Sequence, residues 1–132
     1  MAATLRPGWF VRKIVNSVVS RLGLASTLAV AGRKSGAERT VPVNVLEHQG
    51  ERYLVSPRGE TDWVRNVRAS GHAELRRRGR SERIRVSEIP AQDRAPLIAA
   101  YRAEWDSQVK RYFEQLPDPA DHPTFLIHPN DD

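Results

Sequence analysis

Short segments of alternating apolar and polar residues, separated by glycine turns, recur through the middle of this chain and restrict the folds open to it. Gln49-Gly50 lies between two such segments, and a turn near Gly79 lies between two others. Alternation on both sides of a tight turn is typical of a β-hairpin. The sequence therefore predicts two antiparallel hairpins, built from segments 39–47 and 51–56 and from segments 73–78 and 82–89.

The rest of the chain adds two short strands and three helices to these hairpins. Apolar spacing and end signals predict strands over 27–30 and 124–128, and helices over 9–22, from a cap at Thr61 or Asp62 to a stop at Gly71, and over 91–116. Short, mostly antiparallel strands with a few helices in 132 residues indicate one α+β domain, a small β-barrel with flanking helices. We expect a single domain over 1–132, with loose ends at 1–8 and 129–132.

The amino-acid composition excludes several kinds of functional site. The chain contains no cysteine, which excludes disulfides, zinc–thiolate sites, iron–sulfur clusters and cysteine nucleophiles. Its four histidines lack the spacing of metal ligands, so no metal is expected.

The apolar stretch 9–22 is too short and too polar to span a bilayer, and we expect a cytoplasmic protein. An amphipathic N-terminal helix here is expected to pack on the barrel or cover the site, with peripheral contact to an anionic membrane as the alternative.

Charge is distributed unevenly along the chain, whose net charge is +5. Residues 1–89 carry 17 of the 21 cations and eight of the 16 anions, a balance of +9, whereas residues 90–132 sum to −4. A basic body favours an anionic partner, which could be nucleic acid, an acidic membrane or a small polyanion.

One part of this charge is an arginine cluster in the second hairpin. It consists of Arg76, Arg77, Arg78, Arg80, Arg83 and Arg85. The cluster is interpreted either as a nucleic-acid contact or, preferably, as a solvated edge strand protected against aggregation. Aromatic residues do not alternate with these arginines, so we expect no nucleic-acid partner.

The turn Gly32-Arg33-Lys34-Ser35-Gly36, followed by Arg39, is the most concentrated set of polar groups. A phosphate site needs this combination of open backbone N–H groups, a hydroxyl, a bidentate arginine and a lysine. A solvated hairpin turn is the alternative, because lysine, serine and glycine are common in turns.

A second candidate is Ser56-Pro57-Arg58-Gly59 followed by Trp63 and Asn66. Trp63 and Asn66 are three residues apart and therefore share one face of a short helix. A tryptophan beside a carboxamide can contact and hydrogen-bond a planar heterocycle. The alternative is a core tryptophan, with Asn66 bonded to nearby backbone.

Taken in order, these motifs carry a resemblance. They are Gly-Arg-Lys-Ser-Gly at 32–36, Arg-Thr-Val-Pro-Val at 39–43 and Trp-x-x-Asn at 63–66. The chain resembles the deazaflavin-dependent nitroreductase family over roughly residues 9–128. The resemblance implies a split β-barrel and coenzyme F-420, an 8-hydroxy-5-deazaflavin with a phosphodiester and a polyglutamate tail. It also implies hydride transfer to a small electron-poor acceptor such as a quinone, enone or nitroaromatic.

The same resemblance implies roles for individual residues. Phosphate and tail would be held by Arg33, Lys34 and Ser35. The ring would be lined by Arg39, Thr40, Val41, Pro42, Val43 and Asn44, and closed by Trp63 and Asn66 near Ser56. Arg58 would replace a lysine that family members often carry after the serine. Hydrogen-bond donors to the acceptor would be Ser56, Tyr101 or Tyr112. The alternatives are a split barrel that binds FMN, FAD or another ligand without such turnover, and an arginine-rich binder of anionic surfaces.

Overall fold

The computed structural model describes residues 26–129, and the expected helix over 9–22 lies outside them. The strands are β1 (Ser26–Ala31), β2 (Glu38–Val43), β3 (Val45–His48), β4 (Glu51–Val55), β5 (His72–Arg77), β6 (Arg80–Glu88) and β7 (Thr124–Pro129). The helices are α2 (Asp62–Ser70) and α3 (Ala95–Gln115), with 3₁₀ turns η1 (Ala91–Asp93) and η2 (Pro119–Asp121). These elements confirm the predicted α+β class.

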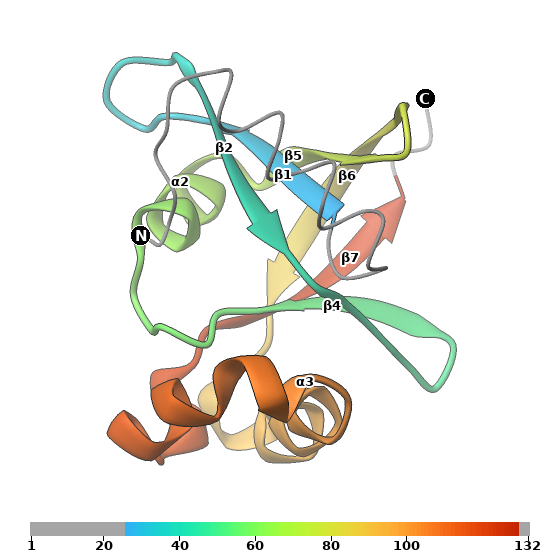
Figure 1. Cartoon of the computed structure of the whole chain (residues 1–132). Coiled ribbons are helices and arrows are strands. Elements are labelled where there is room, and N and C mark those ends of the chain that lie inside the picture. The colour runs from blue at the N-terminus through green and yellow to red at the C-terminus, as the bar shows by residue number, and fades with distance from the viewer. Residues whose placement is uncertain (1–25, 130–132) are drawn as a thin grey trace.

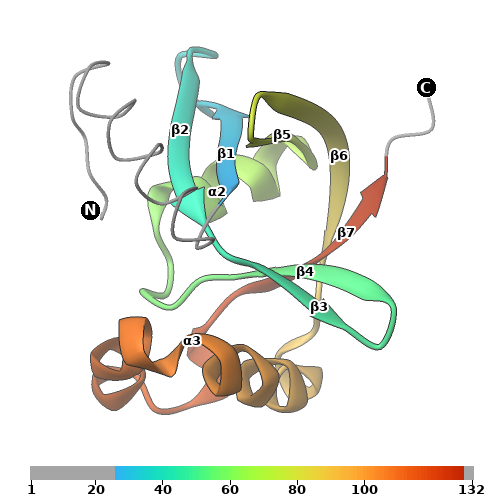
Figure 2. The same cartoon turned by 45° about the vertical axis from the view of Figure 1, so that its right-hand side comes forward.

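All seven strands belong to one antiparallel sheet of order β2-β1-β5-β6-β7-β4-β3 (Figure 1). Its two edge strands, β2 and β3, are consecutive in the chain and are separated only by Asn44. The sheet therefore curls into a half-barrel, as Figure 2 shows. The single strand expected over 39–47 is wrong in this respect: the chain turns a corner at Asn44 and pairs first with β1 and then with β4.

Both predicted hairpins are confirmed. His48 pairs with Glu51 across Gln49-Gly50, and Arg77 pairs with Arg80 across Arg78-Gly79. The two residues of each turn have positive φ, at 53° and 82° in the first and 53° and 78° in the second. Such turns match the right-handed twist of the strands that they connect.

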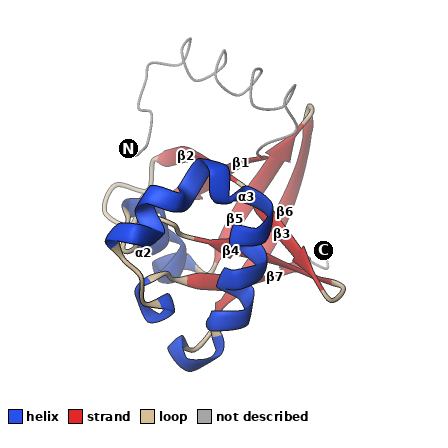
Figure 3. Cartoon of the chain, turned by 60° about the horizontal axis from the view of Figure 1, so that its bottom comes forward, coloured by secondary structure: helices blue, strands red, loops and turns tan. Residues whose placement is uncertain are grey.

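Two hydrophobic clusters hold the molecule together, one on each face of β3 and β4. The barrel core contains Leu28, Leu54, Val64, Ile84 and Phe125, each at most 1% exposed. The second cluster fills the space between the outer face of β3–β4 and α3, and includes Leu46 and Val55. Neighbouring residues along β4 alternate between the two clusters because side chains on a strand point to opposite faces. Helix α3 accordingly lies outside the barrel (Figure 3).

Helix α2 lies against β1 and β5 and buries Val64 and Val67 in the barrel core. It ends as predicted at Gly71, whose φ of 76° is favourable for glycine and whose N–H donates to the Val67 carbonyl. Thr61 is the N-cap residue, but its side chain makes no cap hydrogen bond. The helix therefore begins after Thr61 as predicted, but the expected hydrogen bond from a backbone N–H to the cap side chain is absent.

Candidate functional site

The turn after β1 folds on itself through its own polar groups. The Gly32 N–H donates to the Ala37 carbonyl at 2.8 Å, and the Gly36 N–H donates to the Gly32 carbonyl at 2.8 Å. The Ser35 hydroxyl oxygen accepts from the Ala37 N–H at 3.1 Å. Gly36 has a φ of 78°, a conformation open mainly to glycine. The two glycines thus shape a turn that leaves Arg33 and Lys34 on the surface.

Asn66 fastens this turn to helix α2. Its side-chain oxygen accepts from the Arg33 backbone N–H at 3.0 Å and from Arg33 Nη1 at 2.8 Å. Asn66 is 4% exposed, and Arg33 also lies 3.6 Å from a carboxylate oxygen of Asp62. Two motifs that are 33 residues apart in sequence are therefore in direct contact, and Asn66 holds a side chain of the basic turn.

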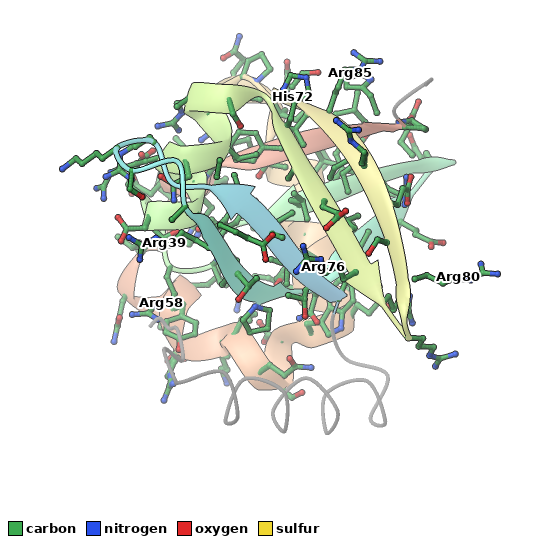
Figure 4. The ribbon with its side chains drawn as sticks, turned by 90° about the horizontal axis from the view of Figure 1, so that it is seen from above. Arg39, Arg58, His72, Arg76, Arg80 and Arg85 are labelled. Carbon is green, nitrogen blue, oxygen red and sulfur yellow. The ribbon has the colours of Figure 1, made fainter. Side chains whose placement is uncertain are left out.

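Two cations beside this contact make no hydrogen bond or ion pair with the described part of the chain. They are Lys34 in the turn and Arg39 on β2, and both are exposed. Arg39 lies next to the turn, since a Cβ at Gly32 would be 3.6 Å from Arg39 Nε. Figure 4 shows Arg39 on the same side of the molecule as Arg58. These cations are available to an anionic group.

The residues of β2 alternate between the two faces of the sheet. Arg39, Val41 and Val43 share the barrel-side face, because they pair with Val30, Leu28 and Ser26. Val43 is buried in the core, whereas Val41 is half-buried and packs against it. Thr40 and Pro42 lie on the opposite face. Only three of the expected lining residues of β2 therefore present side chains to the barrel side.

Trp63 is half-buried at the start of α2 and packs against the same barrel core as Val41. Its ring centroid is 5.9 Å from that of Phe125, with the planes tilted by 54°. An apolar surface that is partly open thus lies at the end of the barrel where Asn66 holds the basic turn. A flat ring with an anionic chain fits this combination of apolar and cationic groups.

Ser56 does not fit the donor role that the resemblance implies. It is 0% exposed, and its hydroxyl donates to the Gly59 carbonyl at 2.6 Å, so that its proton is already used. Its carbonyl faces Nδ1 of His122 at 3.0 Å. Ser56 instead shapes the loop that carries Arg58.

His122 is a residue whose contribution the sequence did not reveal. Its ring is fully buried, stacks on Phe113 with centroids 4.1 Å apart, and places Nε2 2.6 Å from the Leu116 carbonyl. It thereby joins the Ser56 loop to the end of α3. The only sequence signal was a histidine between prolines, a pattern that predicts no partner.

The second attachment of this loop is ionic. Arg68 on α2 donates from Nη1 to Glu60 at 2.9 Å and from Nε to Glu88 on β6 at 2.8 Å. The Arg68 guanidinium, through its hydrogen bond, lowers the pKa of Glu60 below its ordinary value. The loop over 56–61 is thus held from both sides.

The two candidate tyrosines have different surroundings. Tyr101 is 2% exposed and packs on Trp105, and burial raises the pKa of its hydroxyl to about 12 despite a hydrogen bond with Asn44. Asn44 also donates from Nδ2 to Gln108 on α3 at 3.4 Å. Tyr101 and Asn44 therefore join the corner between β2 and β3 to α3, and neither the expected lining role of Asn44 nor the donor role of Tyr101 follows from these contacts.

Tyr112 is half-buried and lies near the Ser56 loop. The Arg58 guanidinium lies 5.7 Å from its ring centroid, and that of Arg111 lies 4.9 Å away. Arg111 Nη2 donates to the Tyr112 hydroxyl oxygen at 2.9 Å, which leaves the hydroxyl proton free to be donated.

The sequence matches the model of one protein family, described as F420H(2)-dependent quinone reductase, over residues 7–115. The chain belongs to this family. It is therefore an oxidoreductase whose cofactor is coenzyme F-420, as the resemblance implied. Among curated proteins, no sequence matches this member of the family.

Solved structures share the fold of this family member. An F420-H2 dependent reductase is 19% identical, with 79% of this chain and 93% of that chain covered and a TM-score of 0.61. A protein described as a domain-swapped dimer is 17% identical, with 93% and 100% covered and a TM-score of 0.60. A NimC/NimA family protein from Clostridium acetobutylicum is 15% identical, with 87% and 77% covered and a TM-score of 0.54. These similarities confirm the split-barrel fold.

Residues 26–129 also bear on the expectations about membrane spans and metal sites. Within this range no helix is long and apolar enough to cross a membrane. The same residues bring together no group of three histidine, aspartate or glutamate side chains suited to a metal ion.

Proposed function

We propose that this F-420-dependent oxidoreductase binds its coenzyme at the end of the barrel where the basic turn meets α2, and that it reduces a quinone. The contact between Arg33 and Asn66 is the observation that supports this site most directly. This contact joins the basic turn, which would hold the anionic tail of the coenzyme, to the Trp-x-x-Asn motif, which would contact its ring. The match to a quinone reductase family supports a quinone rather than an enone or nitroaromatic as the acceptor class.

The roles of the residues follow from their surroundings. Arg33, Lys34 and Arg39 would hold phosphate and tail, because Asn66 orients the first and the other two make no bonds within residues 26–129. Val41 and Trp63 would contact one side of the flat ring with apolar surface. Ser35 would act through the shape of the turn, since its oxygen accepts from Ala37.

When bound, the coenzyme supplies a hydride at C5 and reacts slowly with oxygen, because carbon replaces the flavin N5. The protein's part is to orient the acceptor and to stabilise the negative charge that develops on its oxygen. We assign this donor role to Tyr112, whose hydroxyl accepts from Arg111 and retains its own proton. Arg58, stacked beside the same ring, would add positive charge nearby.

The experiment that tests the site is titration with coenzyme of different tail lengths at low and high salt. We expect longer tails to bind more tightly at low salt, and Lys34→Gln to reduce that difference, since charge-assisted contacts contribute about 1.5–3 kcal/mol before screening. Lys110→Gln on α3 is the matched control, because it removes the same charge outside the site. Equal affinity for tailed and tailless coenzyme would overturn the assignment of the basic turn. Tighter binding of FMN or FAD than of the tailed coenzyme would overturn it as well.

A second measurement tests the reaction itself. Stopped-flow mixing of protein and reduced coenzyme with quinones, enones and nitroaromatics should give reoxidation above the protein-free rate, fastest with quinones. Deuterium at C5 should slow it where hydride transfer limits the rate. Coenzyme binding without reduction of any acceptor would exclude these acceptor classes.

A further inference from the structure

The hairpin of β5 and β6 carries positive charge that the rest of the described chain does not neutralise. The arginines without a hydrogen bond or ion pair within residues 26–129 are Arg77, Arg78, Arg80, Arg83 and Arg85, and all of them are exposed. We call these residues the arginine band.

The glutamates of the same hairpin do not balance this charge, because each is bonded to another arginine. Glu74 pairs with Arg76 at 2.6 Å, and Glu82 pairs with Arg52 at 2.7 Å. Glu88 pairs with Arg68 at 2.7 Å and with Arg94 at 3.1 Å. The acids next to the arginine band are thus bonded to other arginines, and the side chains of the band are exposed.

Protection of a sheet edge explains only part of the arginine band. The sequence favoured a solvated edge strand, but β5 and β6 lie in the middle of the sheet, between β1 and β7. Over 74–76 of β5 and 84–88 of β6 a second strand pairs with the hairpin, but at the tip Arg77 and residues 80–83 pair only with each other and with β5. An open backbone edge therefore remains at the tip alone. The edge interpretation is therefore wrong for Arg85, whose strand is paired on both sides, and applies only to the arginines at the tip.

The band has a defined shape. Arg83 and Arg85 lie on the outer face of β6, since Ile84 between them is buried in the barrel core. His72 on β5 lies directly opposite Arg85. Arg77 and Arg80 face each other at the tip of the hairpin, on the face opposite to that of Arg83 and Arg85. Figure 4 shows Arg85 and His72 at one end of the hairpin and Arg80 projecting from the other.

The tip of the band is separate from the proposed coenzyme site, whereas its Arg85 end lies at the same end of the sheet as the basic turn. β1 runs antiparallel to β5, with Thr27 opposite Arg76 and Ala29 opposite Glu74. The basic turn follows the far end of β1, so the hairpin tip is about five strand residues, or roughly 16 Å, from it. A tail bound at the turn would leave the tip free.

We propose that the arginine band docks this protein on the surface of an anionic phospholipid bilayer. Arginines on an outer sheet face and on both faces of a projecting tip suit the layer of phosphates at a membrane surface, where a guanidinium can bind a phosphate through two hydrogen bonds. The hairpin contains no phenylalanine, tyrosine or tryptophan for stacking on bases, only His72, and no helix to enter a groove, which disfavours nucleic acid. The proposal rests on charge and geometry and does not depend on the acceptor.

The experiment is flotation of the full chain with phosphatidylcholine vesicles that contain about 30% phosphatidylglycerol, compared with phosphatidylcholine alone. We expect binding only to the anionic vesicles, and we expect high salt to weaken it. Each cation near such a surface strengthens binding about fivefold, so Arg83→Gln/Arg85→Gln should weaken it about 25-fold. Arg77→Gln/Arg80→Gln should have a similar effect.

Lys110→Gln is the control, because it removes a positive charge from α3, outside both the band and the proposed coenzyme site. It should retain most of the vesicle binding. Thermal unfolding of all three variants should match the wild type, since the removed side chains make no bonds within the described residues. Failure to bind anionic vesicles, or binding that the control variant loses as strongly as the band variants, would overturn the proposal. Tighter binding to duplex DNA than to vesicles at the same salt would overturn it in favour of nucleic acid.

Discussion

The side-chain oxygen of Asn66 accepts two hydrogen bonds from one residue, the backbone N–H and Nη1 of Arg33. A helix residue that is nearly buried thus sets both the path of the basic turn and the direction of its first arginine. The arrangement makes the affinity for an anionic ligand depend on a neutral residue that need not touch it.

Asn66→Ala should weaken coenzyme binding about tenfold or more, because a hydrogen bond to a charged group contributes roughly 1.5–3 kcal/mol. Unfolding in urea should show a stability loss of about 1–3 kcal/mol, because the buried contact is lost. Asn66→Asp retains the accepting oxygen. Compared with Asn66→Ala, it should recover more of the stability than of the coenzyme affinity, since its negative charge repels an anionic ligand. If Asn66→Ala binds the coenzyme as tightly as the wild type per folded molecule, the turn does not depend on this contact.

Trp63→Phe should weaken coenzyme binding with little loss of stability, because phenylalanine can retain the ring contact with Phe125. In a variant whose other tryptophans, Trp9 and Trp105, are changed to Phe, the fluorescence of Trp63 should be quenched as coenzyme is added. A fall in the melting temperature with unchanged affinity would show that Trp63 is solely a core residue.

Tyr112→Phe should lower kcat roughly 100-fold while the Kd of the coenzyme changes little, because one hydrogen-bond donor to the developing oxyanion is lost. Tyr101→Phe is the matched comparison, since it removes a phenol hydroxyl from the same helix at a buried position. It should alter stability rather than kcat. If single-turnover kinetics show a slower reaction for Tyr101→Phe and an unchanged rate for Tyr112→Phe, the assignment of Tyr112 is contradicted.

Tyr101 should also limit stability at alkaline pH. Burial raises its pKa to about 12, above the ordinary value of 10.0. Its contribution to stability is therefore complete below pH 10 and is lost as the pH rises through about 12, because only the unfolded state ionises in that range. Tyr101→Phe should unfold with a smaller pH dependence over this window, as measured by urea denaturation at several pH values. Identical alkaline profiles would contradict the expectation.

The pair of Arg52 and Glu82 predicts the opposite dependence at acid pH. Two hydrogen bonds, at 2.9 and 2.7 Å, join β4 to β6, and the bond with Arg52 lowers the pKa of Glu82 from 4.5. Its stabilisation is present above pH 4.5 and is lost as the pH falls through the lower folded value. Glu82→Gln should cost about 1 kcal/mol at neutral pH, since the pair is partly exposed, and nothing in strong acid. Glu104→Gln, an exposed change on α3, should show no such trend.

The local elements were largely readable from the sequence because their signals are local. The turns at Gln49-Gly50 and Arg78-Gly79 and the helix end at Gly71 follow from glycine's freedom at positive φ. The barrel class follows from the number and spacing of the strands. The family motifs added the cofactor, which no periodicity could identify.

The candidate site was only partly readable, since contacts between distant elements are not encoded in any one segment. Sequence placed Arg33 and Asn66 in one site through a resemblance, but not the hydrogen bonds between them. Ser56 is expected from the sequence to donate to the acceptor, yet its contacts with His122 and Pro123 bury it completely. The alternative interpretation of Trp63 as a core tryptophan is half right, because the residue packs against the core but is only partly buried.

By itself, the sequence determined where strands turn, where helix α2 stops, and that cations gather at the 32–39 turn and in the second hairpin, because backbone freedom and alternation act over a few residues. Only the tertiary structure decided that segment 39–47 breaks at Asn44 and that the arginine hairpin lies in the middle of the sheet. It also decided which arginines are neutralised. Strand order and ion pairing depend on which surfaces the whole chain buries together. The burial of apolar side chains selects one strand order among all seven strands, and no single segment encodes that order.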